Sequence, residues 1–79
     1  MVEHERPLVN ARGEMDEARG LWRRSAQADP KYPSPLNNLG GVALAAGELD
    51  EAEALLNQAL ALEPGYGDAR INLSLVRAR

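Results

Sequence analysis

The side chains of this sequence that could bind a metal ion or take part in catalysis are its carboxylates, which occur in two short runs. The runs are Glu14, Asp16 and Glu17, and Glu48, Asp50, Glu51 and Glu53. Grouped carboxylates bind metal ions or share the acid and base roles of hydrolysis. Both runs stand where a helix is expected to begin, and negative charge is favourable at the positive end of the helix dipole. We therefore interpret both runs as structural.

No other combination of side chains predicts a catalytic site. His4 is the only histidine and lies in a polar N-terminal arm, whereas a catalytic triad needs a buried histidine that a carboxylate orients. The absence of cysteine excludes disulfides, thiolate metal sites and a thiol nucleophile. No phosphate-binding glycine loop and no metal-binding motif occurs. We expect no enzyme activity, no catalytic residue, no cofactor and no metal.

Composition and charge exclude further classes of protein. The net charge of −3 argues against a nucleic-acid binder. No apolar run reaches the roughly 18 residues that cross a membrane, and the N-terminus lacks the apolar core of a secretory signal. We expect a cytoplasmic protein without a membrane partner. Charge is uneven, because residues 33–66 carry five acids and no Lys or Arg, whereas residues 67–79 carry three Arg and one Asp.

The chain repeats itself at an offset of 34 residues. Segments 13–32 and 47–66 are identical at eight of twenty positions, where unrelated segments share about one. Three further matches continue the repeat, pairing Asn38, Leu39 and Val42 with Asn72, Leu73 and Val76. A repeat of this length indicates a supersecondary unit that stacks on its neighbours.

Each unit is expected to contain two antiparallel helices. Apolar residues recur at three- and four-residue spacing, which predicts helices over 14–28, 35–46, 50–62 and 68–78. Ser34 is expected to cap the second of these with its hydroxyl, and Gly47 to end it. Asp50 with Glu53 resembles the capping box that opens a helix.

A helix-turn-helix unit of this length resembles the tetratricopeptide repeat. Its W-x2-L-G-x2-Y…A-x3-F…P pattern is followed by Leu36, Leu39, Gly40, Ala43, Ala52, Leu56 and Pro64. The three departures, Leu for Trp, Ala for Tyr and Leu for Phe, all stay apolar. The resemblance covers residues 13–79 well and residues 1–12 poorly. It implies an all-α, right-handed superhelical stack of antiparallel hairpins.

The expected organisation is a single domain of about two repeats plus a final helix. Its parts are a degenerate arm over 1–12 with at most a short helix from Pro7 to Arg12, the second helix of repeat one over 13–32, a complete repeat over 33–66, and a capping helix over 67–79. Arg70 and Arg77 replace apolar residues where a further helix would pack, which favours a cap facing solvent. The alternative is a fragment of a longer array.

The predicted core contains Leu39, Leu56 and Trp22. Gly40 is expected to let the first helix of its repeat approach the preceding helix. Trp22 matches Leu56 one repeat earlier, so its ring is expected to fill the space over Gly40 and Ala43. Aromatic residues at helical spacing usually pack in this way, and a binding role for Trp22 is the alternative.

In the family that the chain resembles, the first helix of each hairpin lines a concave peptide-binding face. The positions implied here are Asn37, Asn38, Gly41, Leu44, Ile71, Asn72 and Leu75. We hypothesise that Asn38 and Asn72 hold a peptide backbone, because a carboxamide both donates and accepts hydrogen bonds. The alternative is that each Asn is a polar residue of the helix surface or bonds a neighbouring helix. Leu44, Ile71 and Leu75 are expected to form an exposed apolar stripe.

Two functions remain open from the sequence. One is a non-catalytic scaffold module that binds a peptide segment of a partner protein in the concave groove. The family's carboxylate clamp is not expected, because Asp68 and Asn72 stand where it needs Lys and Arg. The other is self-assembly, in which the incomplete ends of the chain pack against a second copy as a homodimer.

Overall fold

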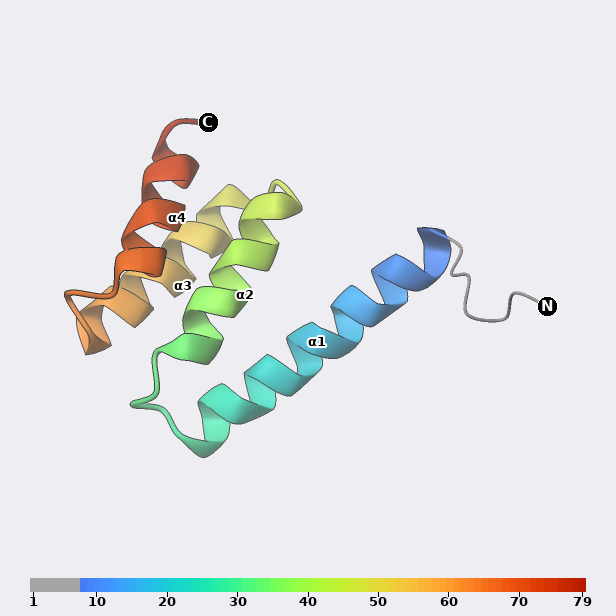
Figure 1. Cartoon of the computed structure of the whole chain (residues 1–79), viewed down its shortest axis with the longest axis horizontal. Helices are drawn as coiled ribbons and strands as arrows, with labels where there is room; N and C mark the ends of the chain where they lie inside the picture. The colour runs from blue at the N-terminus through green and yellow to red at the C-terminus, as the bar shows by residue number, and fades with distance from the viewer. Residues whose placement is uncertain (1–7) are drawn as a thin grey trace.

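Four α-helices make up the part of the chain that the computed structural model describes, residues 8–79, with side chains described from Gly13 onward. They are α1 (Leu8–Ala28), α2 (Ser34–Ala45), α3 (Leu49–Leu62) and α4 (Gly67–Arg77). No strand occurs within residues 8–79. The helices α2, α3 and α4 pack together, while α1 diverges from α2 toward its N-terminal end (Figure 1). The predicted all-α hairpin stack is confirmed.

The hairpin of α2 and α3 is held by close contact between a glycine and a leucine. A Cβ atom built on Gly40 would lie 2.7 Å from Cδ2 of Leu56, whose side chain has no exposed surface. The backbone oxygen of Ala52 lies 3.5 Å from the same point. The prediction that Gly40 faces the preceding helix is therefore wrong, because α3, the following helix, occupies that space.

The turn between α2 and α3 depends on Gly47. Its φ of +79° lies in the left-handed region that residues with a Cβ rarely adopt. This conformation lets the N–H groups of Gly47 and Glu48 donate to the carbonyls of Leu44 and Ala43, at 3.0 and 2.8 Å. The predicted end of the helix at Gly47 is confirmed, and the chain reverses there.

The first helix differs from the prediction. A break near Gly13 was expected, but α1 runs unbroken from Leu8 to Ala28. Gly13 matches Gly47, yet a Cβ atom on Gly13 would meet nothing within 4 Å. A reversal at Gly47 is held by the packing of α3 on α2, and without such packing a continuous helix satisfies the backbone hydrogen bonds of this segment. The expected start of a short helix at Pro7 lies outside the described residues.

The predicted side-chain caps are also wrong. Helix α2 follows Pro33 and α3 follows Glu48, and neither start has a side-chain capping hydrogen bond. Ser34 is already the first residue of α2, and Asp50 is the second residue of α3. Asp50 and Glu51 still place negative charge in the first turn of α3, where the helix dipole favours it.

The core consists of small and aliphatic side chains. Its buried members in the described chain are Leu39, Ala43, Leu44, Ala52, Leu56, Ala59, Ala69, Leu73 and Val76. Leu39 and Leu56 are buried as predicted, whereas Trp22 is only half-buried. Because Leu56 already occupies the space over Gly40, the tryptophan ring has no place in this hairpin.

Candidate functional site

The two helices expected to line a groove, α2 and α4, lie in contact with each other. Asn72 Nδ2 donates a hydrogen bond of 3.1 Å to Oδ1 of Asn37, whose side chain is 7% exposed. Gly41 lies beside this pair, since a Cβ atom there would be 3.5 Å from Asn72 Nδ2. For Asn72 the structure thus supports the alternative of a bond to a neighbouring helix, and the partner is Asn37 rather than Asn38.

The apolar stripe is shorter than expected. Leu44 is 6% exposed and belongs to the core cluster, so its predicted exposure is wrong. Ile71 and Leu75 are 61% and 49% exposed and lie one turn apart on α4. Asn38 is half-buried. Of the three residues predicted to form the stripe, Ile71 and Leu75 are therefore exposed and Leu44 is not.

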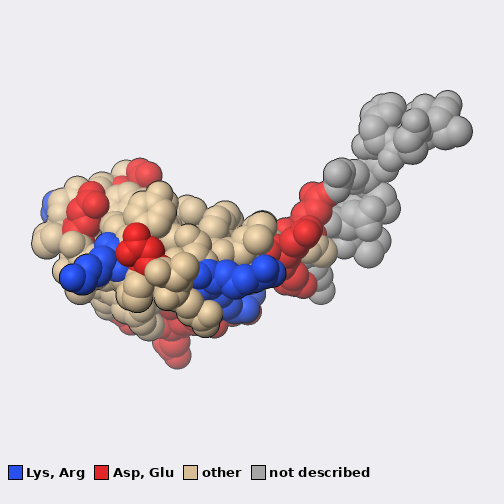
Figure 2. Space-filling model, turned by 90° about the horizontal axis from the view of Figure 1, so that it is seen from below, with Lys and Arg blue, Asp and Glu red and all other residues tan. Residues whose placement is uncertain are grey.

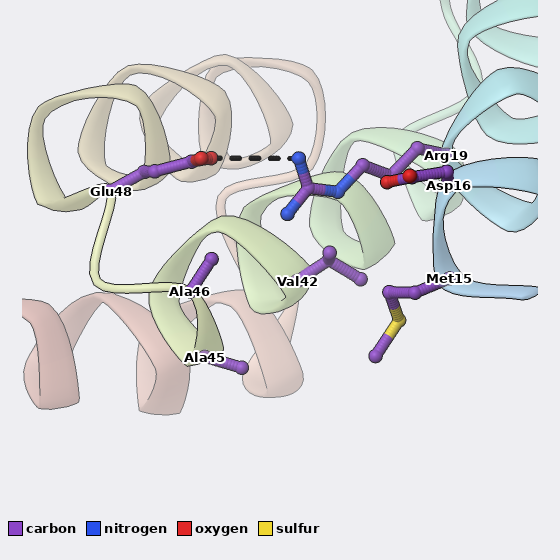
Figure 3. Close-up of a pocket in the computed structure, with 7 residues that line it drawn as sticks. All are labelled: Met15, Asp16, Arg19, Val42, Ala45, Ala46 and Glu48. Carbon is purple, nitrogen blue, oxygen red and sulfur yellow. Dashed lines mark ion pairs between the residues drawn. The ribbon is translucent and has the colours of Figure 1, made fainter. Parts of the chain in front are cut away.

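Sequence reasoning missed a hollow of about 630 Å³ that opens between α1 and α2 (Figure 3). It is lined by Met15, Asp16, Arg19, Val42, Ala45, Ala46 and Glu48. In Figure 3 the Arg19 side chain reaches from α1 toward Glu48, and Met15 and Val42 lie below it. The signal in the sequence was weak, because Met15 and Val42 match Leu49 and Val76 and resemble ordinary core residues.

Arg19 joins the two sides of this hollow. Its Nη1 lies 3.6 Å from Oε1 of Glu48, and its side chain is 20% exposed. The Nε atom of Arg19 is buried and has no hydrogen-bond partner. A buried donor without an acceptor is costly, by about 1–3 kcal/mol, so this side of the hollow favours an acceptor group.

The charged residues of α4 lie in solvent, as predicted. Arg70 is exposed, and the side chain of Arg77 is 65% exposed. Arg77 Nε lies 4.0 Å from Oε2 of Glu53 on α3. An ion pair so exposed contributes about 0–1 kcal/mol, so these arginines are available for other contacts.

Within residues 8–79 no group of three or more His, Asp or Glu side chains is arranged to hold a metal ion. None of the four described helices has the length and apolar character needed to span a membrane. His4 lies outside this part of the chain.

A family model described as tetratricopeptide repeat matches residues 10–70 and, a second time, residues 43–78. The chain belongs to the tetratricopeptide repeat family. No curated protein and no solved structure gives a match. Tetratricopeptide repeats are protein-interaction modules that present extended binding surfaces along the stack. In this repeat α2 and α3 are the two helices of one hairpin, and the 34-residue offset aligns α1 with α3 and α2 with α4.

Proposed function

We propose that the chain is a non-catalytic interaction module that binds an extended, partly apolar peptide segment of a partner protein across α2 and α4. The observation that carries this proposal is the pair of exposed apolar side chains on α4, Ile71 and Leu75. The second pair consists of the carboxamides of Asn38 on α2 and Asn72 on α4, which are both half-buried. In the complex, apolar side chains of the peptide contact Ile71 and Leu75. The peptide backbone forms hydrogen bonds with the carboxamides of Asn38 and Asn72.

The hydrogen bond between Asn72 and Asn37 supports this proposal. A carboxamide offers two N–H donors and one acceptor oxygen, and the bond to Asn37 uses one donor of Asn72. The remaining donor and the oxygen are enough for one peptide group. The bond also fixes the orientation of the Asn72 side chain, which lowers the entropy lost on binding. In this proposal Asn37, Gly41 and Leu44 shape and support the surface.

The test begins with a display library of short extended peptides selected on the full chain. The affinity of a selected peptide is then measured for the parent and for Leu75→Ser. We expect the affinity to fall about tenfold or more, because removal of an apolar contact at the centre of an interface costs roughly 1.4 kcal/mol or more.

Leu62→Ser is the matched control, because Leu62 is 40% exposed at the end of α3 and lies outside the proposed surface. This variant should bind the peptide like the parent. Equal affinity of Leu75→Ser and the parent, or an equal loss in both variants, would contradict the proposed surface.

A further inference from the structure

Five residues of α1 are more exposed than the residues of α3 that match them 34 positions later, namely Met15, Ala18, Leu21, Trp22 and Ser25. Met15 and Leu21 are 44% and 55% exposed, whereas Leu49 and Leu55 are half-buried. Trp22 is half-buried, whereas Leu56 is fully buried. The cause is the number of neighbours, because α3 packs against both α2 and α4, while α1 within the described residues packs only against α2. One side of α1 therefore lacks the cover that α2 gives to α3.

Helix α4 is likewise more exposed than its counterpart α2. After the first two residues of α4, five further residues are exposed, namely Arg70, Ile71, Ser74, Leu75 and Arg77. Their matches on α2 are all buried or half-buried, namely Leu36, Asn37, Gly40, Gly41 and Ala43. On α2 the Gly40 side is covered by α3, and the Asn37 side is covered by α4. Helix α4 has no described helix in either place.

The two ends are thus complementary. Within residues 8–79, α1 matches the second helix of the hairpin, α3, and α4 matches its first helix, α2. These helices are of the right kind to pair, because α4 has 11 residues and its counterpart α2 has 12. We propose that copies of this chain associate head to tail, with α4 of one copy packed against α1 and α2 of the next. In this contact α4 occupies, against α1 and α2 of the next copy, the position that α2 occupies against α3 and α4 within one chain.

The contacts of this arrangement follow from the 34-residue offset. Ser74, the match of Gly40, lies against Ala18 and Trp22, the matches of Ala52 and Leu56. Ile71 and Leu75 match Asn37 and Gly41, which face α4 within the chain. They therefore face α2 of the next copy. The exposed side chains of Ile71 and Leu75 and the half-buried ring of Trp22 thus become covered in the contact.

Charge also favours this pairing. Because the helices of a hairpin are antiparallel, Arg77, about one turn beyond Ser74, lies over the part of α1 that carries Glu14 and Glu17. Acidic side chains gather on α1 next to the residues drawn in grey (Figure 2). Arg70, one turn before Ser74, lies over Trp22, where a guanidinium is favourable above an aromatic ring. Basic residues of one copy thus face acidic and aromatic residues of the next.

The same charges oppose a two-fold dimer through α4. Two copies joined through α4 would bring Arg70 and Arg77 of one copy close to the same two residues of the other. Like charges brought together across an interface are unfavourable. A head-to-tail contact avoids this, and because it uses different faces on the two copies it continues from one copy to the next.

The test is sedimentation velocity over a dilution series, without any peptide, using one variant for each end. Met15→Glu with Leu21→Glu blocks the α1 end, and Ser74→Glu with Arg77→Glu blocks the α4 end. All four residues are exposed in the free chain. No peptide is present, so the result does not depend on peptide binding, although a peptide and a second copy would compete for Ile71 and Leu75. Helix content by circular dichroism confirms that each variant folds, and Leu21→Glu and Arg77→Glu serve as milder single variants if it does not.

The parent is expected to associate increasingly with concentration, and Leu62→Glu, outside the contact, is expected to behave like the parent. Each blocked variant alone should remain monomeric, with an association constant lowered about tenfold or more. An equimolar mixture of the two should form a 1:1 complex, because each keeps one intact end. A monomeric parent, a blocked variant that associates like the parent, or a mixture that stays monomeric would overturn the proposal.

Discussion

At the scale of single residues, two neighbouring asparagines of α2 have different roles. Asn37 is buried and accepts a hydrogen bond from Asn72 of α4, whereas Asn38 is half-buried. The sequence singled out Asn38 because Asn72 is its match one repeat later. Asn38 and Asn72 occupy matching positions within α2 and α4, respectively. Each helix contacts the other through a different side, so the residue of α2 that contacts Asn72 is not its match. The contact pair was therefore shifted by one residue from the matching pair.

This difference predicts unequal effects of the two substitutions on stability. Asn72→Ala should lower the free energy of unfolding by about 1–3 kcal/mol, because it leaves the buried Asn37 oxygen without its donor. Asn38→Ala should change it by less than about 0.5 kcal/mol, as is usual for a substitution away from the core and its hydrogen bonds. Urea denaturation of the two variants measures both values. If Asn38→Ala were the more destabilising of the two, the assignment of the hydrogen bond would be wrong.

At the scale of helices, two matching glycines have different surroundings. Gly47 forms a turn with φ of +79°, whereas Gly13 lies within the continuous helix α1. Gly47→Ala should destabilise the chain by about 1–2 kcal/mol, because a residue with a Cβ is disfavoured in the left-handed region. Gly13→Ala should stabilise α1 by about 1 kcal/mol, because alanine has the higher helix propensity and its Cβ meets nothing within 4 Å.

Thermal unfolding of these two single variants gives the measurement. The melting temperature should fall for Gly47→Ala and rise for Gly13→Ala. A fall in both would mean that Gly13, like Gly47, needs a glycine conformation, and α1 would then be broken as the repeat pattern alone predicts.

The positions of the helices and the face that each buries could be predicted from the sequence, because both follow from the spacing of apolar residues. Leu39 and Leu56 lie on regular stripes and are buried as predicted. The errors occur where a residue depends on a neighbour that the repeat pattern takes for granted. Trp22 matches Leu56 but lacks the helix that covers Leu56, so it is only half-buried. The hollow beside Arg19 was missed for the same reason.

At the scale of the molecule, the chain is extended for its length. Its radius of gyration is 14.0 Å, against roughly 12 Å for a compact domain of this size. The extents of 48 × 32 × 19 Å reflect the divergence of α1 from the other helices (Figure 1). An open shape exposes more helix surface than a closed bundle of the same length, and this suits a molecule whose function is to contact other proteins.

The central claim is that the chain recognises a partner peptide on the surface that α2 and α4 form. The most direct test is an amide spectrum of the isotope-labelled chain, recorded during titration with a peptide selected from the display library. We predict that the largest shifts fall on Asn38, Ile71, Asn72 and Leu75, while residues near Leu62 at the end of α3 stay unchanged. Shifts confined to α1, or to the side of α3 that faces away from α2 and α4, would contradict the claim.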